Sequence, residues 1–119
     1  MTSVPQRWAQ HARYDFDTAR EMLASGRLLY VLVCCQQALE KMLKALIAKR
    51  TNEAPPRLHN LMRLAERAGL QVGEARADFL RELSAFYVQS RYPEEMEDSA
   101  AQPSLELARE TLGRTEEVL

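Results

Sequence analysis

The segment "QQALEKMLKALIAKR", Gln36 to Arg50, decides between two structures that the residues before it leave open. Those residues, "LLYVLVCC" from Leu28 to Cys35, are apolar on every side and include valines, which favour β-strands. In the longer segment the apolar side chains recur at helical steps of three and four: Leu39, Met42, Leu43, Leu46 and Ile47. We therefore predict one helix over about residues 27–50. Because its first half is apolar all round, we expect it to be the central helix of a bundle.

Helical periodicity continues on both sides of this segment. A first helix is predicted from about Pro5 to Gly26, and its apolar stripe consists of Trp8, Ala12, Phe16, Ala19 and Leu23. After the break "TNEAPP", further helices are predicted over about residues 58–68 and 74–90, and a last one opens at Pro103 with Leu105, Ala108 and Leu112 facing inward. The expected fold is a single all-α domain over residues 1–119, an antiparallel four-helix up-and-down bundle with an additional short helix.

Composition excludes several classes of protein. The net charge is −1 over 119 residues, so the chain as a whole lacks the strong positive charge typical of nucleic-acid binding. The adjacent Cys34 and Cys35 would diverge on a helix, so we expect free, buried thiols in a reducing compartment. The longest apolar run is too short to span a bilayer and no signal peptide is visible, so we expect a cytoplasmic protein without membrane contact.

Two groups of residues could carry chemistry. The first is on the second helix, where Gln37, Glu40, Lys41 and Lys44 share one face at steps of three and four. Glu40 and Lys44 stand in the order that favours an intrahelical ion pair, and the simplest interpretation is a surface pair that contributes little to stability. The two histidines and the adjacent cysteines do not form a zinc-site pattern, so no metal or other cofactor is expected.

The second group lies in "YVQSRYPEEMEDSAAQP", Tyr87 to Pro103, where Arg91 precedes an acidic run. An arginine at the C-terminus of a helix interacts favourably with the helix dipole, which is a purely structural role. An arginine can also bind a phosphate through two parallel hydrogen bonds. Both interpretations of Arg91 are open from the residues alone.

In this order and at these distances, "QQALEKMLKAL", "LHNL" (Leu58 to Leu61) and "YVQSRYPEE" resemble the HEPN domain family. The resemblance covers roughly residues 8–112. It implies a small helical bundle that forms a two-fold homodimer and has a nucleotide- or RNA-binding ancestry. In prokaryotes such proteins are often encoded beside a minimal nucleotidyltransferase, and many of these pairs act as toxin and antitoxin.

Active members of that family are metal-independent endoribonucleases, in which four to six residues separate an arginine from a following histidine. The resemblance assigns Arg91, Glu40 and Lys44 to such a catalytic site, and Arg91, Lys44, Lys41 and Gln37 to nucleotide or RNA binding. The sequence departs from the motif, because Met96, Glu97 and Asp98 stand where the histidine belongs. His59 matches a different family position, at the start of the third helix, where we expect it to cap or pack.

The sequence therefore predicts a HEPN protein with a degenerate ribonuclease motif that acts as the dimeric partner of a minimal nucleotidyltransferase. Two alternatives are an active endoribonuclease toxin that uses Arg91 with an unusual base, and a purely structural helical interaction module. Tyr92, next to Arg91, is a candidate for modification, since in some such pairs the nucleotidyltransferase attaches adenylyl groups to a tyrosine near the motif.

Overall fold

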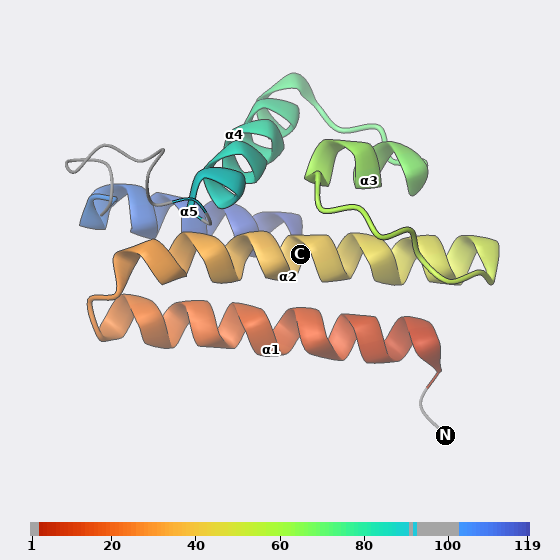
Figure 1. The fold of residues 1–119 in the computed structure, drawn as a ribbon, viewed down its shortest axis with the longest axis horizontal. Helices are drawn as coiled ribbons and strands as arrows, with labels where there is room; N and C mark the ends of the chain where they lie inside the picture. The colour runs from red at the N-terminus through yellow and green to blue at the C-terminus, as the bar shows by residue number, and fades with distance from the viewer. Residues whose placement is uncertain (1–2, 91, 93–102) are drawn as a thin grey trace.

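The computed structural model of the chain describes residues 3–90, 92 and 103–119. Over these residues it contains helices and no strand, which confirms the predicted all-α class (Figure 1). The helices are α1 (Val4–Ala24), α2 (Leu28–Thr51), α3 (Leu61–Arg67), α4 (Glu74–Ser90) and α5 (Leu105–Val118).

Helices α1 and α2 form a long antiparallel hairpin (Figure 1). Ser3 opens α1 with a capping box, in which its side chain accepts from the backbone N–H of Gln6 and the Gln6 side chain accepts from the backbone N–H of Ser3. Gly26 makes the tight turn between the helices with φ +79°, a conformation that a side chain would strain. In this hairpin, α1 covers one side of α2.

Helix α2 is the centre of the fold, as its all-round apolar first half predicted. It packs against each of the other four helices. In Figure 1, α3 lies above the C-terminal half of α2, α4 slants obliquely above its middle, and α5 runs behind its N-terminal half. The α2 side chains of the hydrophobic core are Val31, Leu32, Cys35, Leu39, Leu43 and Ile47. None of the described helices is long and apolar enough to cross a membrane.

Two local predictions were wrong. The third helix begins at Leu61, not Leu58, because Asn60 is its N-cap and its side-chain oxygen accepts from the backbone N–H of Arg63 at 3.0 Å. The last helix buries Ala108 but leaves Leu105 45% exposed, and two threonines complete its inner face. The hydroxyl of the inner Thr115 donates to a carbonyl one turn earlier in the same helix at 2.8 Å, so its burial leaves no donor unpaired.

Candidate functional site

A chain of polar side chains is buried on α2. Gln36, Glu40 and Lys44 follow one another at single-turn spacing, and Glu40 and Lys44 are only 4% and 6% exposed. The Lys44 ammonium lies 3.1 Å from Oε2 of Glu40 and 5.5 Å from the centre of the Trp8 ring on α1. The prediction that Glu40 and Lys44 form an ion pair on the surface is therefore wrong. The pair is inside the protein, where each charge depends on the other for compensation.

His59, in the loop before α3, is the fourth member of this cluster. Its ring nitrogen Nδ1 is 3.0 Å from Oε1 of Glu40, and Nε2 of Gln36 donates to its backbone carbonyl at 2.9 Å. The loop is thus fastened to α2 at two points. The cap of α3 is Asn60, and the His59 side chain is 56% exposed, so the expectation that His59 caps or packs was wrong. The position of the His59 ring is set by its contact with the Glu40 carboxylate.

The exposed side of His59 faces a pocket of about 510 Å³ between the N-terminal half of α2 and the end of α4. Within it, Nε2 of Gln37 donates to the phenol oxygen of Tyr87 at 2.7 Å, which bridges the two helices. The residues that line the pocket are Leu29, Tyr30, Val33, Gln37, His59, Tyr87 and Ser90. It therefore combines two aromatic rings with several hydrogen-bonding groups.

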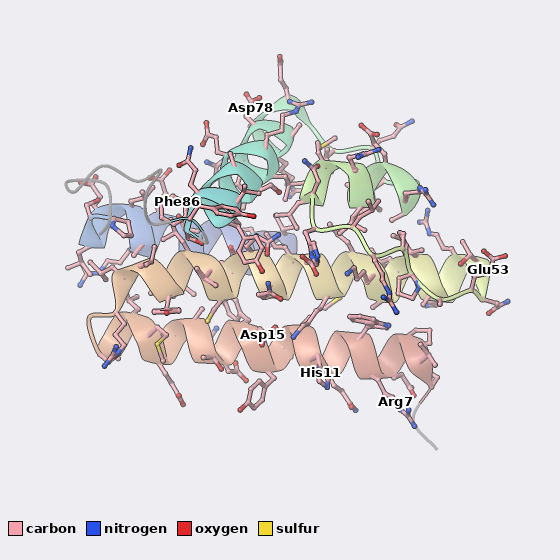
Figure 2. The ribbon with its side chains drawn as sticks, viewed as in Figure 1. Arg7, His11, Asp15, Glu53, Asp78 and Phe86 are labelled. Atoms are coloured by element: carbon pink, nitrogen blue, oxygen red, sulfur yellow. The ribbon has the colours of Figure 1, made fainter. Side chains whose placement is uncertain are left out.

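The residues predicted for the site are only partly brought together. Glu40 and Lys44 are in contact, and Gln37 lines the pocket beside them. Lys41 points to α1, where its ammonium lies 2.7 Å from Oδ2 of Asp15, a residue on the side of α1 that faces α2 (Figure 2). Tyr92 is about half exposed. Arg91 lies outside the described residues, although Ser90, its neighbour in the chain, lines the pocket.

Sequence reasoning missed His59, Tyr87 and Gln36 as members of this site. His59 contacts Glu40 and Tyr87 contacts Gln37, and both are brought to α2 from distant parts of the chain by the packing of α3 and α4 on that helix. One signal was available. Gln36, Glu40 and Lys44 form a polar stripe at steps of four on a helix whose first half is apolar all round, so their burial could have been inferred from the predicted central position of that helix.

Metal and thiol chemistry find little support in the described part of the chain. It holds no group of three or more His, Cys, Asp or Glu side chains that could bind a metal ion. Burial raises the pKa of the Cys35 thiol to about 11, and burial also raises the pKa of Cys34. Both thiols therefore stay protonated near neutral pH and are weak nucleophiles. In the pocket, the side chain suited to proton transfer is the imidazole of His59.

Comparison with known proteins gives a family and a structural neighbour. The model of the HEPN domain family matches residues 5–119. The crystal structure of TT1696 from Thermus thermophilus is similar over 100% of both chains, with a TM-score of 0.73 and 26% sequence identity. No curated protein matches the chain.

Proposed function

The chain belongs to the HEPN domain family, and on this premise we propose that it binds a nucleotide or RNA at the pocket between α2 and α4. We further propose that it does so as a homodimer and as the partner of a minimal nucleotidyltransferase in a toxin–antitoxin-type pair. The ribonuclease motif is degenerate, because no histidine follows Arg91.

The observation that carries the binding proposal is the pocket lined by Tyr30, Gln37, His59, Tyr87 and Ser90. Tyr30 is 52% exposed, so its ring is available for stacking on a nucleobase. Gln37 and His59 offer hydrogen-bonding groups at the same place. Ser90, which precedes Arg91 in the chain, also lines the pocket, and an arginine guanidinium is suited to binding a phosphate.

The cations assigned to ligand binding have different roles in this proposal. Arg91 binds the phosphate directly. Lys44 acts indirectly, since its ammonium is buried against Glu40 and Trp8 and instead fixes the carboxylate that holds His59. Lys41 would have to leave Asp15 to reach a ligand, so its contribution is secondary.

The binding experiment is a titration of fluorescent ATP and of a short fluorescent RNA with the wild-type protein and Arg91→Ala. A charge-assisted hydrogen bond contributes roughly 1.5–3 kcal/mol, so Arg91→Ala should weaken binding roughly tenfold to a hundredfold. Gln10→Ala, on the exposed side of α1, is the matched control and should bind like the wild type. Absence of binding of both ligands to the wild type would contradict the proposal and favour a purely structural interaction module.

The partner proposal needs a separate measurement. Co-expression with the proposed minimal nucleotidyltransferase partner should yield a complex on a sizing column with light scattering, and the free chain should elute as a dimer. Intact mass spectrometry of the co-expressed chain tests modification of Tyr92, which is accessible on the surface. An adenylyl mass increase that Tyr92→Phe abolishes is the expected result, and an unshifted mass would end that part of the proposal.

A second candidate function is metal-independent cleavage of RNA, and the observation that favours it is the imidazole of His59 in the same pocket. A histidine can take the proton of a ribose 2′-hydroxyl, the role that the motif histidine would have had. Expression in cells followed by inspection of total RNA tests this. Intact RNA, with growth indifferent to Arg91→Ala and to His59→Ala, would exclude it.

A further inference from the structure

We infer that a positively charged surface, formed by the C-terminal end of α2, the loop after it and α3, binds the phosphates of a single-stranded RNA that also enters the pocket between α2 and α4. This basic surface consists of Lys49, Arg50, Arg57, Arg63 and Arg67. The inference rests on the proposed function and deepens it, because it selects an RNA strand over a free nucleotide as the ligand.

Positive charge is concentrated in this part of the chain. Residues 49–67 contain these five lysines and arginines and two carboxylates, Glu53 and Glu66, although the whole chain has a net charge of −1. All five cationic residues are exposed. A local excess of one charge attracts ligands of the opposite charge even where the net charge of the molecule does not, so this surface is suited to an anion.

The charges of the basic surface are not compensated within the described structure. On α1, α4 and α5, by contrast, Arg20, Arg81 and Arg114 each form an ion pair. Among the residues that the structure describes, no carboxylate lies within ion-pair distance of a side chain of the basic surface. Arg63 and Arg67 are also one turn apart on α3, a spacing at which like charges repel. A bound anion would therefore relieve this repulsion.

Arg50 fixes the two halves of the basic surface relative to each other. Its guanidinium donates to the backbone carbonyl of Ala68, at the C-terminal end of α3. Gly69 leaves room for this contact, because a Cβ at that position would come 2.8 Å from Nη1 of Arg50. The helix that carries Arg63 and Arg67 is thus held against α2 before a ligand arrives, so less of the chain must be ordered on binding.

The basic surface adjoins the proposed binding pocket. It contains a hollow of about 290 Å³ that is lined by Leu58, Arg63, Glu66 and Arg67. His59, the residue after Leu58, lines the pocket between α2 and α4. The loop that carries both residues runs back along α2 to the start of α3 (Figure 1). A strand of a few nucleotides can therefore occupy the pocket and the basic surface together, whereas a mononucleotide occupies one of them.

The chemistry of the two places identifies the ligand. Tyr30 in the pocket is 52% exposed, and a base can stack on its ring only if that base is not stacked within a duplex, which points to a single strand. The basic surface holds four arginines, and a guanidinium binds phosphate oxygens through parallel hydrogen bonds. A single-stranded RNA supplies both an unpaired base and a series of phosphates.

The first test compares a strand with a mononucleotide on the wild-type protein. Binding of a fluorescent ten-residue oligoadenylate is measured by anisotropy, and binding of AMP by calorimetry, each over a series of salt concentrations. For a single strand, each phosphate contact contributes about 0.7 to the slope of log affinity against log salt concentration. The oligoadenylate should therefore show a slope of magnitude about 2 or more, and AMP a slope below about 1.

The second test removes two charges of the basic surface. Arg63→Gln/Arg67→Gln should lower the magnitude of the oligoadenylate slope by about 1.4 and weaken its binding roughly tenfold to thirtyfold at about 0.1 M salt. Its affinity for AMP should stay within about twofold of the wild type, which also shows that the variant is folded. Arg13→Gln/Arg109→Gln is the matched control. It removes the same charge from exposed positions on α1 and α5, two helices that do not pack against α3 in the described structure, and it should bind the oligoadenylate like the wild type.

The outcomes separate this inference from the proposed function. If AMP binds but the oligoadenylate has no steeper salt slope, or if both double variants bind it equally well, the basic surface is not an RNA site and the binding proposal stands. If Arg63→Gln/Arg67→Gln keeps the affinity for the oligoadenylate and loses the complex with the nucleotidyltransferase, the surface binds an acidic protein and the inference is overturned. If neither AMP nor the oligoadenylate binds to the wild type, the proposed function fails and the inference fails with it.

Discussion

Replacing Lys44 by methionine is the sharpest test of the buried cluster. The change keeps the length and apolar stem of the side chain and removes only the ammonium, which lies 3.1 Å from Oε2 of Glu40. The carboxylate would then stay buried with His59 as its remaining partner among the described residues. Breaking one side of a buried pair costs about 3–5 kcal/mol, because the other charge is left uncompensated.

That loss is large for a domain of this size. The free energy of unfolding of a small domain is about 5–15 kcal/mol, so Lys44→Met would remove a large share of it. Each kcal/mol corresponds to roughly 3–6 °C in Tm at this chain length, so we expect a decrease of roughly 10–30 °C. Thermal and urea unfolding followed by far-UV circular dichroism measure it.

Two further variants make the interpretation specific. Lys41→Met is the matched control, because its partner Asp15 and its own ammonium are both partly exposed, and it should cost about 1 kcal/mol or less. The double variant Glu40→Gln/Lys44→Met removes both charges and should recover much of the loss, with a coupling energy of about 2 kcal/mol or more. If Lys44→Met costs no more than Lys41→Met, or if the penalties of the single variants add in the double variant, the buried pair is not the coupled unit described above.

The remaining predictions concern one helix cap and one thiol. Asn60→Ala removes the acceptor for the backbone N–H of Arg63 and should destabilise the protein by about 1 kcal/mol in urea unfolding, whereas Asn60→Ser should be nearly neutral; an unchanged midpoint for alanine would contradict the cap. Burial raises the pKa of Cys35 to about 11, from an ordinary value of 9.0, so above about pH 9 the unfolded chain releases a proton that the folded chain keeps. Stability should therefore fall towards pH 11, by about 3 kcal/mol in total from this thiol, and Cys35→Ala should remove that part of the loss; equal slopes in both proteins would contradict it.

The helices were predictable because their signal is local. Apolar steps of three and four depend only on neighbours in the chain, and they placed four of the five helices within a few residues of their observed ends. The start of α3 was missed for the same kind of local reason, since the cap at Asn60 competes with the apolar pattern that begins at Leu58. In α5 the pattern favoured leucines, but two threonines are buried, and the hydroxyl of Thr115 is paired within the helix because it donates to the carbonyl of Thr111.

The site was less predictable because a glutamate and a lysine four residues apart look the same in a sequence whether they are exposed or buried. Whether such a pair is buried depends on the parts of the chain that pack over it. Here these are Trp8 on α1 and the loop that carries His59. The central position of α2, however, was predicted from sequence, and it has a consequence for every polar residue on that helix. A helix that packs against four others has little solvent-exposed surface on which a charged side chain could be hydrated. A charge that is buried on it needs a partner inside the protein, and the partners of Glu40 are Lys44 on the same helix and His59 in the loop before α3.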